Sequence, residues 1–211
     1  MTLRLYRTHQ GYELQDPDSR QRPLTINFRS QKLRYRINTG GKELLAKAVG
    51  ARPGLLVLDC TAGLGIDSFI LASRGCEVIM VERSHTLYLM LEDALARARA
   101  DSQLAEIVAR MRLERGDAKQ VMNRLERIPD VISIDPMFPA KRKRAGVRGE
   151  LQRMQQLIGK DEDTRGLVLA AQSTGCKRVV VKRPLVGGSS DGLTPSHVVR
   201  GKASRFDVYS L

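Results

Sequence analysis

The stretch LLVLDCTAGLGID, residues 55–67, decides the fold of this chain of 211 residues. Residues 55–58 are all apolar, which is typical of a strand buried on both faces. Asp59 and the glycines Gly63 and Gly65 then predict a tight turn that leads into an apolar helix. Glycines let a backbone approach a ligand closely, and the first turn of a helix offers unpaired N–H groups. The stretch therefore predicts a ligand-binding turn at the end of a central strand.

Strand-like and helix-like segments alternate from residue 55 onward. Helical patterns at residues 86–100, 104–110 and 118–125 are separated by apolar runs, and two further runs lie near the end of the chain. The later strands are predicted at residues 77–82, 111–115, 131–135, 178–182, 197–200 and 206–209. This order predicts an α/β fold of the Rossmann-like type, with a mostly parallel sheet of seven strands and helices on both faces.

The first part of the chain has a different pattern. Apolar and polar residues alternate at 3–7, 12–15 and 24–28, with a turn cluster at 16–20, which predicts a small antiparallel β appendage. A basic stretch at 29–36 follows as a linker, and a short helix at 42–49 ends at Gly50. We therefore divide the chain into an appendage with its linker, residues 1–40, and a main domain, residues 41–211.

The net charge of +13 is unevenly distributed. Residues 1–52 and 141–211 are strongly basic, whereas residues 53–140 carry a small excess of acidic side chains. Basic flanks favour a polyanionic partner, and nucleic acid is the natural candidate. A merely solvated basic surface is the alternative.

Other features of the composition limit the cellular context. The sequence has no apolar run long enough for a membrane span and no apolar signal core at its start, so we expect a cytoplasmic protein. Cys60, Cys76 and Cys176 are far apart and form no C-x-x-C pair, which favours reduced thiols over a disulfide framework or a metal site.

Polar residues follow four of the predicted strands. Ligands of a doubly wound sheet bind outside the carboxyl ends of its strands, so we expect these residues to converge on one crevice. There, Glu82 can accept hydrogen bonds from both hydroxyls of a ribose, and Asp117 can meet an adenine edge; each could instead serve as a helix cap or a solvated strand end. The four signals are Asp59 with the glycine turn, Glu82-Arg83, Asp117-Ala118 and Asp135.

The glycine turn alone does not identify the ligand, because dinucleotide folds also combine such a turn with an acidic second-strand end. Here the third glycine of G-x-G-x-x-G is missing, and Asp67 lies where a pyrophosphate would arrive. Carboxylates at the turn suit a cationic ligand without phosphate. The turn resembles motif I of class I S-adenosylmethionine-dependent methyltransferases, whose sulfonium cofactor is such a ligand.

The segment DPMFP, residues 135–139, resembles the (D/N/S)-P-P-(Y/F/W) motif of methyltransferases that act on exocyclic amines of nucleobases. Such an amine is a poor nucleophile, so its lone pair must be oriented for in-line displacement. Asp135 and the carbonyl of Pro136 can accept the amine hydrogens, while Phe138 stacks on the base. A plain proline-capped turn is the alternative.

Basic residues follow this loop directly. We expect Lys141, Arg142, Lys143 and Arg144 to contact phosphates, rather than to form only a solvated loop. The Lys182-Arg183 turn lies at the same predicted sheet edge, where substrate contact and a surface turn are equally compatible with the sequence.

Together these motifs, with VVVKRP at 179–184, resemble the RsmJ-type 16S rRNA guanine-N2 methyltransferases. The resemblance implies a class I methyltransferase fold and methyl transfer from S-adenosylmethionine (SAM) to N2 of one guanine near the 3′ end of 16S rRNA, in naked RNA or the small ribosomal subunit. It implies a cofactor pocket formed by Asp59, Thr61, Gly63, Gly65, Ile66, Asp67, Glu82, Arg83, Asp117, Ala118 and Asp135.

Three alternatives stay open on the sequence. The enzyme could methylate another amine, such as adenine N6 or a protein side chain. An NAD-dependent oxidoreductase is compatible with the glycine turn and Glu82, although the sequence shows no obvious hydride-transfer histidine or separate substrate domain. A noncatalytic RNA-binding module would not require Asp135 or Phe138.

Overall fold

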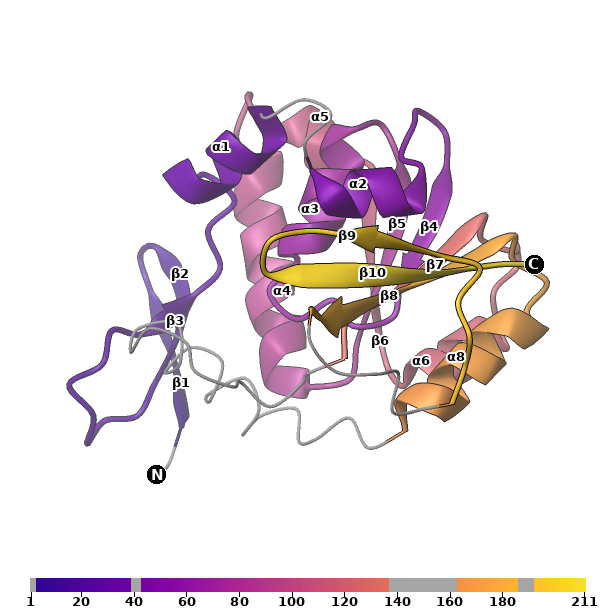
Figure 1. Cartoon of the computed structure of the whole chain (residues 1–211). Helices are drawn as coiled ribbons and strands as arrows, with labels where there is room; N and C mark the ends of the chain where they lie inside the picture. The colour runs from indigo at the N-terminus through magenta and orange to yellow at the C-terminus, as the bar shows by residue number, and fades with distance from the viewer. Residues whose placement is uncertain (1–2, 39–42, 137–162, 186–191) are drawn as a thin grey trace.

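Two β-sheets and two layers of helices form the structure, a computed structural model that describes residues 3–38, 43–136, 163–185 and 192–211 (Figure 1). The main sheet has seven strands in the order β6-β5-β4-β7-β8-β10-β9. Strands β4 to β8 are parallel, and β10 pairs antiparallel with both β8 and β9. The strands are β4 (Leu56–Asp59), β5 (Glu77–Glu82), β6 (Met111–Arg115), β7 (Val131–Ile134), β8 (Arg178–Pro184), β9 (His197–Arg200) and β10 (Ser204–Ser210).

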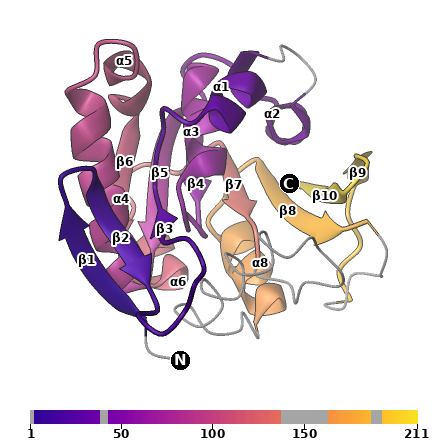
Figure 2. The same cartoon turned by 90° about the vertical axis from the view of Figure 1, so that its left-hand side faces the viewer.

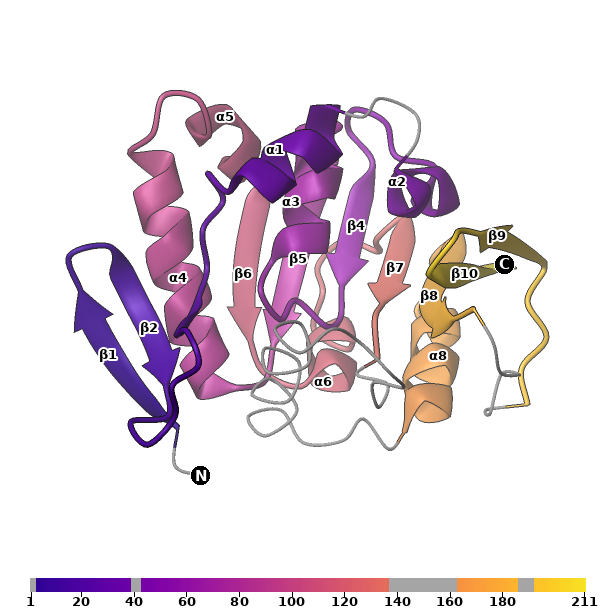
Figure 3. The same cartoon turned by 60° about the vertical axis from the view of Figure 1, so that its left-hand side comes forward.

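Helices cover both faces of this sheet (Figure 3). Alternate residues of each central strand point to opposite faces, so Val57 belongs to one apolar core and Leu58 to the other. The first core packs against helices α2 to α5, and the second packs against α6 and α8. The helices are α1 (Gln31–Asn38), α2 (Leu44–Val49), α3 (Ile66–Ser73), α4 (His85–Arg99), α5 (Ala105–Val108), α6 (Ala118–Met122) and α8 (Thr164–Ser173).

The strand order reverses beside β4. The chain moves from β4 outward to β5 and β6, and then returns to place β7 on the other side of β4. In a doubly wound sheet, this switch point opens a crevice at the carboxyl ends of the strands. The glycine turn after β4 therefore lies where the topology favours a ligand. None of the described helices is long and apolar enough to cross a membrane.

The predicted α/β fold with its seven-stranded, mostly parallel sheet is confirmed. Strands β5, β6 and β9 have the predicted bounds, while β8 continues to Pro184 because Pro184 pairs with Ser204 of β10. Helix α1 differs from the prediction, because residues 29–36 were expected to form a linker. Its single buried residue, Leu33, gives too weak an apolar pattern to predict a helix.

The predicted N-terminal β appendage is also confirmed, as an antiparallel sheet of β1 (Arg4–Thr8), β2 (Gly11–Gln15) and β3 (Leu24–Thr25). It lies along helix α4 (Figure 2), where Arg97 Nη2 donates to the carbonyl of Ile26 at 3.0 Å. Leu14 and Phe28 are buried in the same core as the main sheet. The division of the chain at residue 40 stays a prediction.

The glycine turn depends on Gly65. This residue adopts the left-handed conformation, with φ at +70°, as the cap of helix α3. A Cβ added there would lie 2.8 Å from Leu91 Cδ2 and 3.2 Å from Phe28 Cζ. Phe28 itself stacks on Phe69 of α3, with ring centroids 4.9 Å apart. The turn therefore has apolar side chains packed directly beneath it.

We predict that Gly65→Ala destabilises the protein more than Gly54→Ala. Gly54 has a similar φ of +75° but no neighbour within 4 Å of an added Cβ, so its substitution tests the backbone alone. We expect a loss of about 1 kcal/mol in unfolding free energy for Gly54→Ala and about 2–4 kcal/mol for Gly65→Ala. Urea denaturation measures both, and equal losses would contradict the packing argument.

Candidate active site

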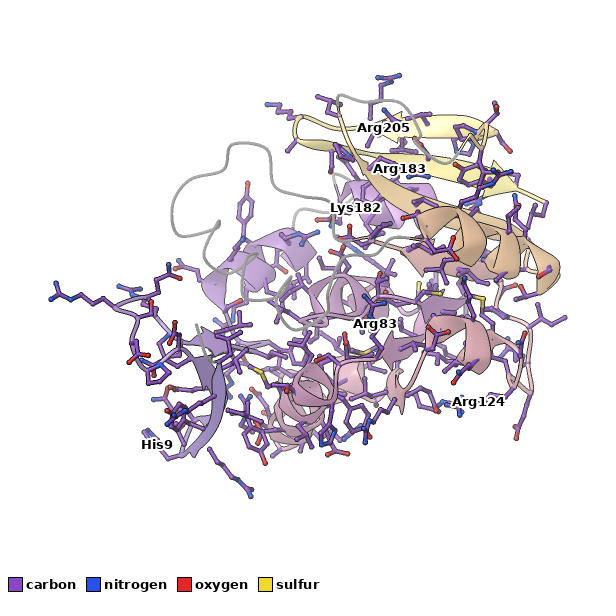
Figure 4. The ribbon with its side chains drawn as sticks, turned by 90° about the horizontal axis from the view of Figure 1, so that it is seen from below. His9, Arg83, Arg124, Lys182, Arg183 and Arg205 are labelled. Carbon is purple, nitrogen blue, oxygen red and sulfur yellow. The ribbon has the colours of Figure 1, made fainter. Side chains whose placement is uncertain are left out.

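A pocket of about 570 Å³ opens at the carboxyl ends of the central strands. Figure 4 looks onto this edge, where Lys182 lies between Arg83 and the pair Arg183 and Arg205. The four strand-end signals expected to converge do so here. The predicted residues that line the pocket are Asp59, Thr61, Gly63, Ile66, Asp67, Glu82, Arg83, Asp117, Ala118, Asp135, Pro136 and Lys182.

Among the described residues, two predicted site residues, Gly65 and Arg183, do not line the pocket. Gly65 shapes the turn from behind and does not line the pocket. Phe138, Lys141, Arg142, Lys143 and Arg144 lie outside the described residues, so their assigned roles stay predictions.

Glu82 links the glycine turn to the start of helix α4. Its side chain is buried, and its two oxygens accept hydrogen bonds from Gly63 N at 2.9 Å and Ser84 N at 2.7 Å. Burial raises the pKa of Glu82 to about 7, although the two backbone bonds favour the ionised form. Glu82 therefore has a structural role and still lines the pocket, so the two interpretations of this residue are compatible.

Asp59 supports the other side of the turn. Its oxygens accept hydrogen bonds from Thr61 N at 3.1 Å and Ser68 Oγ at 2.5 Å. Burial raises the pKa of Asp59 to about 6, and the nearby charges of Asp67 and Asp135 act in the same direction. Hydrogen bonds within the protein thus fix the carboxylate of Asp59 in a buried position near two other carboxylates.

Lys182 lies between two carboxylates of the pocket. Its Nζ is 3.1 Å from Asp67 Oδ2 and 2.5 Å from Asp135 Oδ2. Burial alone would lower the pKa of Lys182, but the two carboxylates outweigh it and raise this pKa above the usual value. Strand β8 therefore places a permanent cation beside the ends of β7 and α3.

Asp67 has a second cationic partner from outside the sheet. Arg36 of helix α1 approaches Asp67 Oδ1 at 3.3 Å, and Glu43 holds the same guanidinium through two hydrogen bonds of 2.8 and 3.1 Å. Burial would raise the pKa of Asp67, but Lys182 and Arg36 hold it below its usual value. Arg36 was not predicted as a site residue, because the linker assignment hid its position on a helix beside the pocket.

Thr61 joins the glycine turn to the predicted catalytic segment. Its Oγ1 accepts a hydrogen bond from the backbone N of Asp135 at 2.8 Å. The backbone of Asp135 is thus held from β4, while its carboxylate is held from β8 by Lys182. These two contacts fix the start of the DPMFP segment.

Asp117 caps helix α6. Its Oδ1 accepts hydrogen bonds from Lys119 N at 2.9 Å and Gln120 N at 3.3 Å, and Asp117 also lines the pocket. Lys119 extends to Asp163, the cap of helix α8, with 2.5 Å between Nζ and Oδ2. Sequence reasoning identified Asp117 but not Lys119 or Asp163, because their contact joins residues far apart in the chain.

The expectation for Arg183 is corrected by its burial. Only 2% of its side chain is exposed, and its Nε is 3.4 Å from Oδ2 of Asp207, which also pairs with Arg205 at 2.8 Å. Since successive strand residues face opposite sides of the sheet, Lys182 points to the pocket while Arg183 points to the other face, where it lies beside Asp207 of β10. Arg183 therefore lies neither in a surface turn nor where RNA could reach it.

Comparison with known proteins agrees with this geometry. A family model described as "Putative SAM-dependent methyltransferase" matches residues 1–211. Ribosomal RNA small subunit methyltransferase J of Pseudomonas fluorescens is 44% identical over 207 residues, which are 95% of this chain and 79% of that relative. The protein of the same name from Chromohalobacter salexigens is 41% identical over 195 residues, which are 89% of this chain and 76% of that relative.

A solved structure extends the match to three dimensions. The SAM-dependent methyltransferase of Neisseria gonorrhoeae is 35% identical, with a TM-score of 0.79, and the match covers 98% of this chain and 81% of that chain. The chain belongs to the RsmJ family of SAM-dependent methyltransferases. Its cofactor is therefore SAM, and the oxidoreductase alternative is excluded by the family.

The pocket of this RsmJ-family enzyme fits a sulfonium cofactor. Its wall contains the carboxylates of Asp59, Asp67, Glu82 and Asp135, which would repel a pyrophosphate and attract a cation. Glu82, at the end of β5, retains lone pairs that could accept from ribose hydroxyls in addition to the two backbone donors. Asp117 and Ala118, at the end of β6, lie where an adenine edge is expected.

We predict that SAM binds more tightly as the pH rises through the pKa of Glu82. The pKa of Glu82 is 4.5 in the unfolded chain and about 7 in the folded protein. Between these two values the folded apoenzyme binds more protons than the unfolded chain, so its unfolding free energy falls as the pH rises. The ribose hydroxyls of SAM donate hydrogen bonds, so they bind the ionised carboxylate of Glu82 better than the protonated one. The dissociation constant should therefore decrease roughly tenfold from about pH 6 to about pH 8.

Isothermal titration calorimetry measures this effect. Glu82→Gln should bind SAM weakly, with little pH dependence over the same range. Glu126→Gln, at an exposed position on the opposite edge of the sheet, is the control and should behave like the natural protein. A pH dependence that persists in Glu82→Gln would assign the titration to another group.

We also predict that Lys182→Met destabilises the folded apoenzyme, because Asp67 and Asp135 lose their shared cation. The side chain of Lys182 is 31% exposed, so we expect a loss of about 1–3 kcal/mol, less than for a fully buried pair. Lys177, 81% exposed and paired with Asp130, is the control; Lys177→Met should cost less than about 0.5 kcal/mol. Equal losses in urea denaturation would show that Lys182 behaves as a surface cation.

Proposed function

We propose that this enzyme transfers a methyl group from SAM to the exocyclic N2 of one guanine near the 3′ end of 16S rRNA. The observation that carries the proposal is the position of Asp135, which is held at the mouth of the cofactor pocket by Thr61 and Lys182. The names of the relatives, ribosomal RNA small subunit methyltransferase J, support an rRNA substrate. The basic flanks of the chain support a polyanionic one.

The chemistry of the amine explains why Asp135 is required. The N2 lone pair of guanine is delocalised into the base, so it must be turned toward the reacting carbon. The carboxylate of Asp135 accepts a hydrogen bond from the amine and offsets the positive charge that develops on nitrogen. When bound, SAM supplies the electrophilic methyl group. Pro136, buried beside Asp135, limits the backbone freedom of the segment.

Lys182 has a positioning role in this scheme. It holds one oxygen of Asp135, so the other oxygen remains available for the amine. Its contact with Asp67 fixes the ammonium group from the opposite side. The carboxylate is therefore oriented before the base arrives, which reduces the reorganisation required during the reaction.

We predict that Asp135→Asn lowers methyl transfer by at least about 100-fold while RNA affinity changes little. The amide keeps the size of the side chain but loses the negative charge beside the amine. Small ribosomal subunits isolated from cells that lack the enzyme, incubated with labelled SAM, provide the assay. Glu126→Gln is the matched carboxylate control and should retain full turnover.

Analysis of the labelled nucleoside tests the substrate. We expect N2-methylguanosine at one position near the 3′ end of the RNA. Label on adenine N6, or on a ribosomal protein, would replace the proposed substrate with another amine. Unchanged turnover in Asp135→Asn would refute the role of this carboxylate.

A further inference from the structure

Helix α1 (Gln31–Asn38), whose Arg36 lines the pocket, exposes an aromatic side chain. Tyr35 is 73% exposed, the largest value among the exposed large apolar residues of the described chain. Of the eight residues of the helix, only Leu33 is buried. Tyr35 therefore contributes little to the core, and its ring is available for contact with another molecule.

Two of the three cations of α1, Lys32 and Arg34, lack the carboxylate partners that many other surface cations have. Arg97, Arg110 and Arg127 each pair with an acidic side chain. Among the described residues, Lys32 and Arg34 form no ion pair; the contact of Arg34 is with the amide of Gln103 at 3.5 Å. The helix also has no acidic residue of its own. This surface therefore carries an excess of positive charge around an exposed ring.

A continuous set of contacts connects this surface to the reacting group. Arg36, the residue after Tyr35, contacts Asp67 at 3.3 Å, and Lys182 bridges Asp67 and Asp135 at 3.1 and 2.5 Å. Helix α1 also packs against α3, whose first turn carries Asp67 (Figure 3). A strand of RNA that lies on α1 would therefore be close to Asp135, the proposed acceptor of the target amine.

We infer that Lys32, Arg34 and Tyr35 form a binding surface for the RNA strand that flanks the target guanine. The two cations contact phosphates, and the ring of Tyr35 stacks on a neighbouring base. Single-stranded RNA is recognised by this combination of basic side chains and aromatic faces. The inference rests on the proposed rRNA substrate and extends it to a surface that the sequence motifs did not indicate.

Binding measurements with an RNA of the 3′ region of 16S rRNA test the stacking contact. Tyr35→Ala should raise the RNA dissociation constant roughly 5- to 100-fold, whereas Tyr35→Phe and Tyr35→Trp keep affinity near that of the natural protein. SAM affinity should be unchanged in all three, which verifies that the pocket is intact. Tyr6→Ala, on strand β1, is the aromatic control and should bind RNA normally.

The salt dependence of binding tests the cations. Removing two contacts with single-stranded phosphates in Lys32→Ala/Arg34→Ala should reduce the slope of log K against log salt by about 1.4. Arg127→Ala/Lys177→Ala removes the same charge at the opposite edge of the sheet and should leave the slope unchanged.

Three outcomes would overturn the inference. RNA affinity that stays normal in Tyr35→Ala and in Lys32→Ala/Arg34→Ala would show that α1 does not bind RNA. Equal loss in Tyr35→Phe and Tyr35→Ala would assign the contact to the hydroxyl rather than to stacking. A defect with assembled subunits but not with naked RNA would identify a ribosomal protein as the partner. Failure of the natural protein to methylate rRNA would instead refute the proposed function, and the binding assay would still test α1.

Discussion

The crowding of carboxylates at one edge of a parallel sheet is the constraint on which the site depends. Parallel strands all end at the same edge, so Asp59, Glu82 and Asp135 are brought together by topology, and Asp67 joins them from α3. Burial raises the pKa of Asp59 and Glu82, so desolvation opposes the ionisation of both carboxyl groups. Lys182 offsets part of this repulsion by lying between Asp67 and Asp135.

The same electrostatics separates this pocket from those of dinucleotide-binding folds with similar topology. A glycine turn and a helix N-terminus attract anions in general. Here the acidic side chains around the turn reverse that preference, so a cationic cofactor without phosphate is favoured. The fold thus provides the location, and the side chains at the strand ends select the ligand.

The sequence was sufficient for the sheet and for the strand-end residues, because both depend on local signals. Apolar runs identified the strands, and Glu82 and Asp135 follow these runs directly. The sequence was insufficient where contacts join distant residues: Arg36 reaches Asp67, and Lys182 reaches Asp135, across elements that no local pattern connects. Arg183 was misplaced for a related reason, since the strand continues two residues beyond its predicted end at residue 182 and this side chain is buried.

The packing of Phe28 beneath Gly65 couples two parts of the chain that appear separate in the topology. Phe28 follows the N-terminal sheet, and its ring supports both the glycine turn and Phe69 of α3. A ligand that stabilised the packing of the turn on Phe28 would also stabilise the docking of residues 3–28, and by thermodynamic reciprocity that docking would increase affinity for the ligand. Phe28 is thus the residue through which the N-terminal region shares a packing contact with the cofactor-binding turn.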